Sequence, residues 1–177
     1  MLRDAFLIIE DKRFYGHHGI DWLRATGAVI SNVRTLSFGQ GFSTITMQLA
    51  GNIFPERINR RDRTGLSALG RKLKEVKVAR AIDARYSKDR ILELYLNQID
   101  LGNGAHGVET ASQRYFGKSA RPLHLPEVAT LAALPNAPGR YNPRRFPDRA
   151  IQRRNTVIEV MRREGLVSDA DASVAKA

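Results

Sequence analysis

The chain has 177 residues, 42% of them hydrophobic, which is long enough for one domain with a substantial core. Its 29 Lys and Arg against 18 Asp and Glu give a net charge of +11, which favours a nucleic acid, an anionic membrane surface or a phosphate-bearing substrate as partner. The absence of cysteine excludes disulfide bonds and thiolate catalysis. The sequence has neither a basic and aromatic run of the kind that stacks single-stranded bases nor a zinc-finger spacing, but charge alone does not choose among these partners, and a basic nucleic-acid binder stays an alternative.

In chain order, apolar residues recur with a helical period, and no strand-like alternation lasts long enough to form a sheet. The expected fold class is therefore all-α. Residues 35–41 and the basic residues 55–70 are expected to be loops, and the proline-rich residues 135–143 an ordered turn. The expected helices cover residues 2–9, 22–33, 43–52, 71–86, 88–97, 108–116, 126–134 and 148–164.

The two ends of the sequence resemble the interior of a longer protein. Residues 2–9 already have the pattern of a packed helix, and residues 168–173 have the capping-type spacing of a new helix start. No apolar run approaches the roughly 20 residues that cross a bilayer, and no signal peptide is visible. We therefore interpret the chain as a piece of a longer protein.

Glu10 and Asp11 stand side by side where the first expected helix meets a turn, and His17 follows closely. Adjacent carboxylates repel each other, and burial or a like-charged neighbour can raise the pKa of one of them into the range of a general base. The pair is thus a candidate for a general base at the mouth of a cleft. The alternative is a solvated helix end followed by a polar turn.

Glu75 is the second candidate. At 100° per residue it lies in line with Arg71 on the helix, bordering the apolar face, and Lys72 is also within reach. Taken by itself, this pattern favours an ordinary helix ion pair, which contributes only a few tenths of a kcal/mol.

A short polar helix offers hydroxyl and amide groups at Ser43, Thr44 and Gln48. Such groups at a helix N-terminus suit hydrogen bonding to sugar hydroxyls or phosphate oxygens. The alternative is ordinary helix capping.

These residues fall in four blocks, at residues 10–21, 41–48, 71–75 and 91–97. In this order the blocks resemble the glycosyltransferase domain of class A penicillin-binding proteins and monofunctional peptidoglycan glycosyltransferases (glycosyltransferase family 51), from about Leu2 to Ser168. The resemblance implies an all-α fold with a lysozyme-like helical large lobe and a smaller membrane-facing lobe. Residues 1–177 would form a single glycosyltransferase domain, without the family's N-terminal membrane helix or the transpeptidase domain of its bifunctional members.

The resemblance also implies roles for individual residues. Glu10 matches the catalytic glutamate, and Glu75 is a second catalytic position that supports a cationic site for a pyrophosphate leaving group. That site sometimes bears a metal in the family, so Mg²⁺ or another divalent cation is the implied cofactor and Glu75 its implied ligand. The implied substrate-binding residues are Asp11, Phe14, His17, Ser43, Thr44, Gln48, Arg71, Lys72, Lys74, Asn136 and Arg153. Arg153 is preferred over its neighbour Arg154 because of its spacing from Asn136.

The implied reaction is the polymerisation of lipid II into β-1,4-linked glycan with release of undecaprenyl pyrophosphate, by an inverting mechanism with Glu10 as base. The implied partners are lipid II, the growing glycan strand, an anionic membrane surface and other cell-wall synthesis proteins, with no nucleic acid. The implied location is the outer face of the bacterial cytoplasmic membrane, with anchoring through a segment outside this chain.

The chain departs from the family at two positions. Met47 stands where glutamine is common, and Gly51 stands where a basic residue usually follows the second block. Since that basic side chain is thought to neutralise the pyrophosphate, its loss keeps a catalytically impaired lipid II-binding domain as an alternative. A lysozyme-like glycan-cleaving enzyme is a further alternative, although it would need no cationic site.

Overall fold

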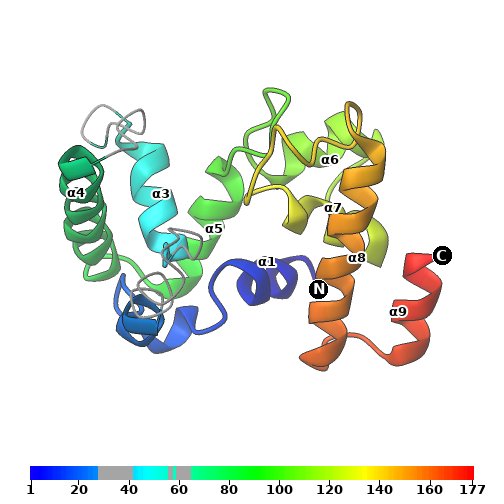
Figure 1. Cartoon of the computed structure of the whole chain (residues 1–177), viewed down its shortest axis with the longest axis horizontal. Coiled ribbons are helices and arrows are strands. Elements are labelled where there is room, and N and C mark those ends of the chain that lie inside the picture. Colours follow the sequence, from blue (N-terminus) through cyan, green and yellow to red (C-terminus); the bar gives the residue numbers. More distant parts are fainter. Residues whose placement is uncertain (28–41, 56–57, 59–64) are drawn as a thin grey trace. The chain divides into compact units, whose positions relative to one another are not determined.

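The computed structural model of the chain describes residues 1–27, 42–55, 58 and 65–177 (Figure 1). This part of the chain consists of helices, one short 3-10 turn and an isolated antiparallel bridge between Asp100 and His106, so the expected all-α class is confirmed. The expected loop at 35–41, the end of the expected helix 22–33 and most of the basic stretch before residue 65 lie outside the described residues.

The chain divides into two compact units, consistent with a fold of two lobes. Unit 1 comprises Met1–Lys12 and Leu96–Ala177, and unit 2 comprises Arg13–Tyr95. None of the helices in the described ranges is both long and apolar enough to cross a membrane.

Unit 1 is built around one apolar helix, α7 (Leu125–Ala133). The sequence of α7 is apolar on nearly all sides, and it contacts helices α1, α6, α8 and α9 (Figure 1). The bounds of these four are Leu2–Glu10, Val108–Phe116, Pro147–Arg163 and Asp169–Lys176. An apolar helix is stable in water only when it is covered in this way, because burial of its surface drives the packing. Residues 135–143 form an ordered turn between α7 and α8, as expected.

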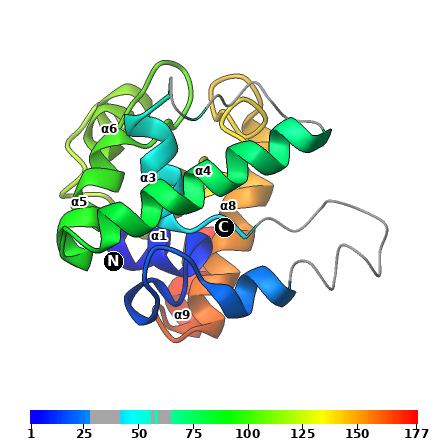
Figure 2. The same ribbon diagram turned by 90° about the vertical axis from the view of Figure 1, so that its left-hand side faces the viewer.

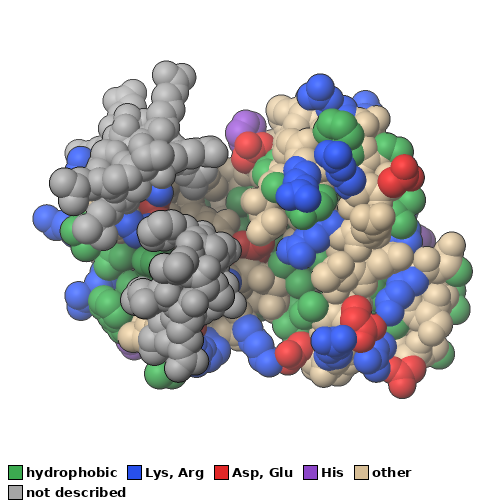
Figure 3. Space-filling model, in the orientation of Figure 1, with side chains coloured by type: hydrophobic (Ala, Val, Ile, Leu, Met, Phe, Trp, Pro, Cys, Tyr) green, Lys and Arg blue, Asp and Glu red, His purple; other side chains and the backbone are tan. Residues whose placement is uncertain are grey.

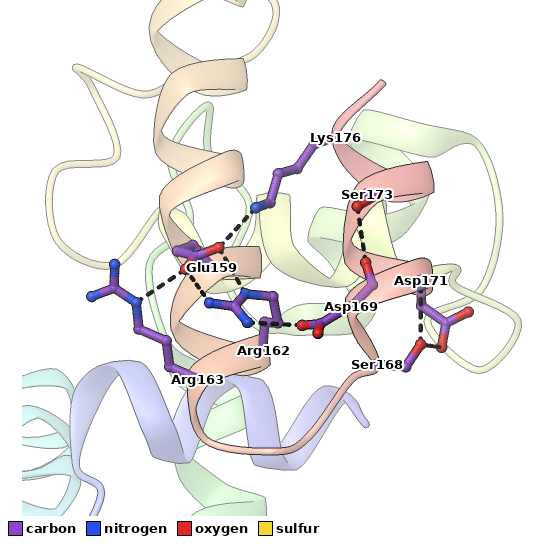
Figure 4. A network of polar contacts seen from close by, with 8 residues as sticks. All are labelled: Glu159, Arg162, Arg163, Ser168, Asp169, Asp171, Ser173 and Lys176. Carbon is purple, nitrogen blue, oxygen red and sulfur yellow. Dashed lines mark hydrogen bonds and ion pairs between the residues drawn. The ribbon is translucent and has the colours of Figure 1, made fainter.

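A network of charged side chains fastens α9 to α8 (Figure 4). Glu159 accepts hydrogen bonds from Arg162 at 2.8 Å, from Arg163 at 3.0 Å and from Lys176 at 2.8 Å. Arg162 also reaches Asp169 at 2.8 Å. The hydrogen bonds from Arg162, and then those from Lys176 and Arg163, hold the pKa of Glu159 far below its ordinary range.

Unit 2 contains the turn of the first block, the helical residues 22–27, two packed helices and most of a further helix. Helix α3 (Ile45–Ile53) packs on α4 (Gly65–Asp83), as Figure 2 shows from the side of α4. Helix α5 (Lys88–Gln98) follows, and residues 14–16 form the 3-10 turn. The buried side chains of Ile20, Met47 and Ala79 join the first block to both packed helices.

Helix α4 begins at Gly65 and ends at Asp83, whereas the sequence led us to expect residues 71–86. The expectation of a loop over residues 55–70 was therefore wrong for residues 65–70, which are helical. The amphipathic periodicity of α4 is weak, since charged residues alternate with apolar ones all around it, so periodicity could not locate its start. The other expected helices that lie wholly within the described residues agree with the structure to within about two residues, and of the expected helix 22–33 the described residues 22–27 are helical.

Candidate active site

The second and third sequence blocks meet in unit 2 around the carboxylate of Glu75. Its side chain is 7% exposed, and its two oxygens face Arg71 Nη1 on one side and Lys72 Nζ, at 2.9 Å, on the other. Lys72 Nζ also donates to Ser43 Oγ at 2.6 Å and lies 4.8 Å from the centre of the Phe42 ring. We call Ser43, Arg71, Lys72 and Glu75 the Lys72 cluster. Its two cations and one carboxylate give it an excess positive charge beside a hydroxyl group, which suits the binding of an anion.

Thr44 and Gln48 have different positions from Ser43. Thr44 is fully buried: its hydroxyl donates to the carbonyl of Gly19 at 2.7 Å and accepts from the N–H of Met47 at 3.2 Å. Gln48 Oε1 accepts from the hydroxyl of Tyr95 at 3.2 Å. These contacts tie elements of unit 2 together, as the capping interpretation anticipated for Thr44. Their roles in substrate binding stay predictions.

The turn of the first block is held by side chains that the sequence analysis had left without a role. Asp21 accepts hydrogen bonds from Nε and Nη2 of Arg13, at 2.9 and 2.8 Å, and from the backbone N–H of Arg24 at 3.0 Å. Burial opposes ionisation of Asp21, but the N–H of Arg24 and the guanidinium of Arg13 outweigh it and lower the pKa. An Asp eight residues after an Arg gives no local signal, so sequence reasoning missed this pair.

Phe14 and His17 shape the inside of this turn. Phe14 is fully buried, and its ring meets that of His17 edge to face with centroids 6.2 Å apart. Lys88 Nζ lies 4.6 Å from the centre of the Phe14 ring and pairs with Asp83 at 2.6 Å. The side chain of the neighbouring His18 is 97% exposed.

Glu10 and Asp11 belong to unit 1. Glu10 is the last residue of α1, at the negative end of the helix dipole, where a carboxylate is not stabilised. Asp11 is 1% exposed, and its N–H closes the helix on the carbonyl of Leu7 at 2.8 Å. Because α1 packs on α7 and α8, the position of this acidic pair is fixed by the core of unit 1.

Asn136 and Arg153 also belong to unit 1. Asn136 is exposed in the turn after α7. The guanidinium of Arg153 lies 5.7 Å from the centre of the Tyr141 ring, and its Nε is buried without a hydrogen-bond partner among the described residues. Arg154 instead donates to Asn155 at 2.9 Å and to the carbonyl of Lys176 at 3.4 Å. Of the two neighbouring arginines, Arg153 is therefore the one with a buried donor still to satisfy.

Lys74 is separate from the Lys72 cluster. It is exposed and borders a hollow on α4 with Phe54 and Lys77. Gly51, the second position at which the sequence departs from the expected family pattern, is buried within α3.

The described part of the chain contains no group of three His, Asp or Glu residues that could hold a metal ion. Both oxygens of Glu75 already face cations. This arrangement does not fit a divalent cation held by the protein at Glu75. The divalent cofactor stays a prediction.

Comparison with known proteins identifies the family. A transglycosylase family model matches residues 1–162. The chain belongs to the transglycosylase family. It is 49% identical over 165 residues to penicillin-binding protein 1A of Aquifex aeolicus (strain VF5), covering 93% of this chain and 22% of that protein. It is 46% identical over 166 residues to penicillin-binding protein 1A of Escherichia coli (strain K12), covering 93% and 18%.

Penicillin-binding protein 1F of Bacillus subtilis (strain 168) is 43% identical over 175 residues, covering 99% of this chain and 23% of that protein. This transglycosylase chain thus spans about a fifth of the length of the curated relatives it matches. A crystal structure of penicillin-binding protein 1A from Haemophilus influenzae is 45% identical and covers 50% of this chain and 13% of its own, with a TM-score of 0.49. The sequence relatives confirm the expected family.

Proposed function

We propose that this transglycosylase domain is a peptidoglycan glycosyltransferase that polymerises lipid II into β-1,4-linked glycan strands. The observation that carries the proposal is the Lys72 cluster on α4, in which Arg71, Lys72 and Ser43 surround Glu75. A transfer reaction that releases a pyrophosphate needs such a cluster, because the leaving group departs as a stable anion and requires positive charge rather than an acid.

In the proposed reaction Glu10 takes the proton from the 4-hydroxyl group of the acceptor's N-acetylglucosamine. That oxygen then bonds to the anomeric carbon of N-acetylmuramic acid at the end of the growing chain. The bond from this carbon to the pyrophosphate oxygen breaks, its electron pair leaves with undecaprenyl pyrophosphate, and the configuration inverts from α to β. Asp11, which is buried beside Glu10, would hold the end of α1 in place.

The remaining predicted residues supply binding and charge. Arg71 and Lys72 would meet the pyrophosphate with Ser43, and Lys74 and Arg153 would add positive charge. A divalent cation bound with the substrate's phosphates would contribute Lewis-acid charge neutralisation. Phe14 and His17 would keep the first block in shape, and Asn136 would contact the glycan.

The surroundings of this domain follow from the same proposal. We infer that residues 1–177 are one glycosyltransferase domain of a longer protein that carries an N-terminal membrane helix and, in a bifunctional relative, a transpeptidase domain. Lipid substrates confine the reaction to the outer face of the cytoplasmic membrane, and the net charge of +11 suits an anionic membrane surface. Other cell-wall synthesis proteins are the proposed protein partners.

The test is polymerisation of labelled lipid II in detergent with Mg²⁺, read as glycan length on a gel. Glu10→Gln is expected to lower the rate by about 10² to 10⁴, since it removes a general base. Asp4→Asn, an exposed acid on the same helix, is the matched control and should keep the parental rate. Near-parental polymer from Glu10→Gln would remove Glu10 from the mechanism, and cleavage of finished glycan would favour a lysozyme-like hydrolase instead.

Gly51 favours a second candidate, a domain that binds lipid II but transfers sugar poorly. Its absent side chain removes one positive charge that the family usually has after the second block. In this case the parent would bind lipid II with little polymer, and Gly51→Arg would raise the yield. Abundant polymer from the parent would eliminate this candidate.

A further inference from the structure

The aromatic ring of Phe42 lies against the ammonium group of Lys72. Lys72 Nζ is 4.8 Å from the centre of the ring, inside the range of about 6 Å over which an aromatic face attracts a cation. Phe42 belongs to the short stretch before α3, and it packs against the buried side chains of Ile20, Met47 and Ala79. Because this core cluster supports the ring, the ammonium group meets a fixed surface.

The ring differs in charge from the polar groups that contact the same nitrogen. Lys72 Nζ also lies 2.6 Å from Ser43 Oγ and 2.9 Å from Glu75 Oε2. The carboxylate of Glu75 cancels one positive charge of the cluster. The face of Phe42 attracts the cation through its quadrupole, without a net negative charge and without accepting a proton. The ring therefore holds the ammonium group and leaves its charge to act on an anion.

The burial of Lys72 strengthens this contact. Its side chain is 18% exposed, so water screens the attraction of the ring only weakly. Figure 3 shows other Lys and Arg side chains of unit 2 at the surface next to hydrophobic ones, and on α4 Lys77 and Arg80 are exposed. Contacts of such exposed cations with apolar neighbours contribute little, since water competes for the charge. Lys72 is thus held more firmly than the exposed cations of its own helix.

We propose that Phe42 is a positioning residue of the anion site, whose ring keeps Lys72 Nζ beside Ser43 before the ligand arrives. The proposal rests on the proposed function, in which the anion is the pyrophosphate of the substrate. A long side chain that is already ordered loses less conformational freedom on binding, which raises the affinity for the anion. Without the attraction of the ring, the four-carbon stem of Lys72 gains freedom, and the ligand has to order it.

The test replaces Phe42 by phenylalanine analogues with one, two, three and five ring fluorines. Fluorine changes the size of the ring little but progressively removes the negative charge from its face. Titration calorimetry with inorganic pyrophosphate is the measurement, and the affinity should fall stepwise to about a tenth of the parental value with five fluorines. No measurable binding to the parent, or the same affinity with every ring, would overturn the proposal.

Two natural side chains examine the same contact. Phe42→Tyr keeps an aromatic face and should bind pyrophosphate like the parent. Phe42→Leu is apolar without such a face and should bind about as weakly as the analogue with five fluorines. Circular dichroism should show the parental helical content in both. Equal affinities in the two variants would mean that only apolar bulk matters at this position, which would overturn the proposal.

Two controls connect the effect to the pair of Phe42 and Lys72. In Lys72→Gln the number of fluorines should no longer influence pyrophosphate binding, because the cation that meets the ring is absent. Fluorination of Phe146 in unit 1, whose ring centre lies 5.1 Å from the guanidinium of Arg149, should leave the affinity unchanged. A dependence on fluorine that persists in Lys72→Gln would contradict the pairing and overturn the proposal.

Polymerisation of lipid II separates this proposal from the proposed function. The fluorine series should lower the polymerisation rate in the same order as the pyrophosphate affinity. If pyrophosphate binding follows the number of fluorines but the parent makes no polymer, the proposed function fails and the role of Phe42 at an anion site stands. If the parent polymerises lipid II at one rate with every ring, the role of Phe42 is overturned.

Discussion

Lys72 Nζ lies 2.6 Å from Ser43 Oγ, which links two blocks that are 29 residues apart in the chain. The same nitrogen lies 2.9 Å from Glu75 Oε2. One ammonium group thus positions both the hydroxyl and the carboxylate of the proposed pyrophosphate site.

Lys72→Gln is therefore expected to lower lipid II polymerisation by about a hundredfold, as loss of one electrostatic donor to a leaving group does. The measurement is initial rate at saturating lipid II. Lys118→Gln, which removes a lysine paired with Glu127 at 2.9 Å in unit 1, should leave the rate within about twofold. An unchanged rate in Lys72→Gln would place the leaving group elsewhere.

Thr44→Val tests the buried hydroxyl that joins the first block to α3. It should lower the free energy of unfolding by about 1 to 3 kcal/mol, because the N-cap is lost and the carbonyl of Gly19 loses its partner. Thr156→Val is the control: its exposed hydroxyl only donates to a carbonyl of its own helix. Urea unfolding followed by circular dichroism measures both, and equal midpoints would contradict the role of Thr44.

Gly19→Ala tests the close approach of the first block to α4. Gly19 has φ +78°, and an added Cβ would lie 2.9 Å from the backbone of Ala79 and Arg80. Gly165→Ala has nearly the same strain, at φ +73°, but nothing lies within 4 Å of its Cβ. Gly165→Ala should cost about 1 kcal/mol and Gly19→Ala distinctly more, as measured by thermal unfolding. Equal losses would mean that the contact with α4 is unimportant.

Acid should release α9 from α8. The pKa of Glu159 in the folded protein lies below its ordinary value. The stability that its ion pairs contribute is therefore complete above about pH 4.3 and is lost as the pH falls toward the folded-state pKa. Heteronuclear NOE values of the α9 amides should therefore fall as the pH is lowered from about 5 to about 2. Glu159→Gln should show mobile α9 amides throughout, without this pH step. A parent whose α9 stays ordered at the acid end would contradict the prediction.

The sequence predicted those features that depend on local composition. α7 was predicted as a helix over residues 126–134, and the block from Ser43 to Gln48 as part of a helix over residues 43–52 with capping residues at its start. The start of α4 was missed, since its charged residues obscure the helical period. Composition also could not decide which of the hydroxyls of Ser43 and Thr44 contacts Lys72. The hydroxyl of Thr44 caps α3 and donates to the carbonyl of Gly19, 25 residues earlier in the chain, so the hydroxyl of Ser43 is the one that contacts Lys72.

The arginine pair in α8 illustrates the same limit. Spacing favoured Arg153, and the structure shows why the two differ: Arg154 is occupied by Asn155 and Lys176. That occupation depends on α9, a helix of which only the start was visible in the sequence. Long-range partners of this kind are beyond any local pattern.

The ion pairs between α9 and α8 determine where this protein can be truncated without loss of packing. The family match ends at residue 162, yet Asp169 and Lys176 hold side chains of α8, and Ala172 and Ala175 are buried. Cutting the gene at the edge of the family match would strip α8 of these neighbours and expose part of its apolar surface to water. The unit that should be expressed, grafted or recombined as a block extends at least to Lys176.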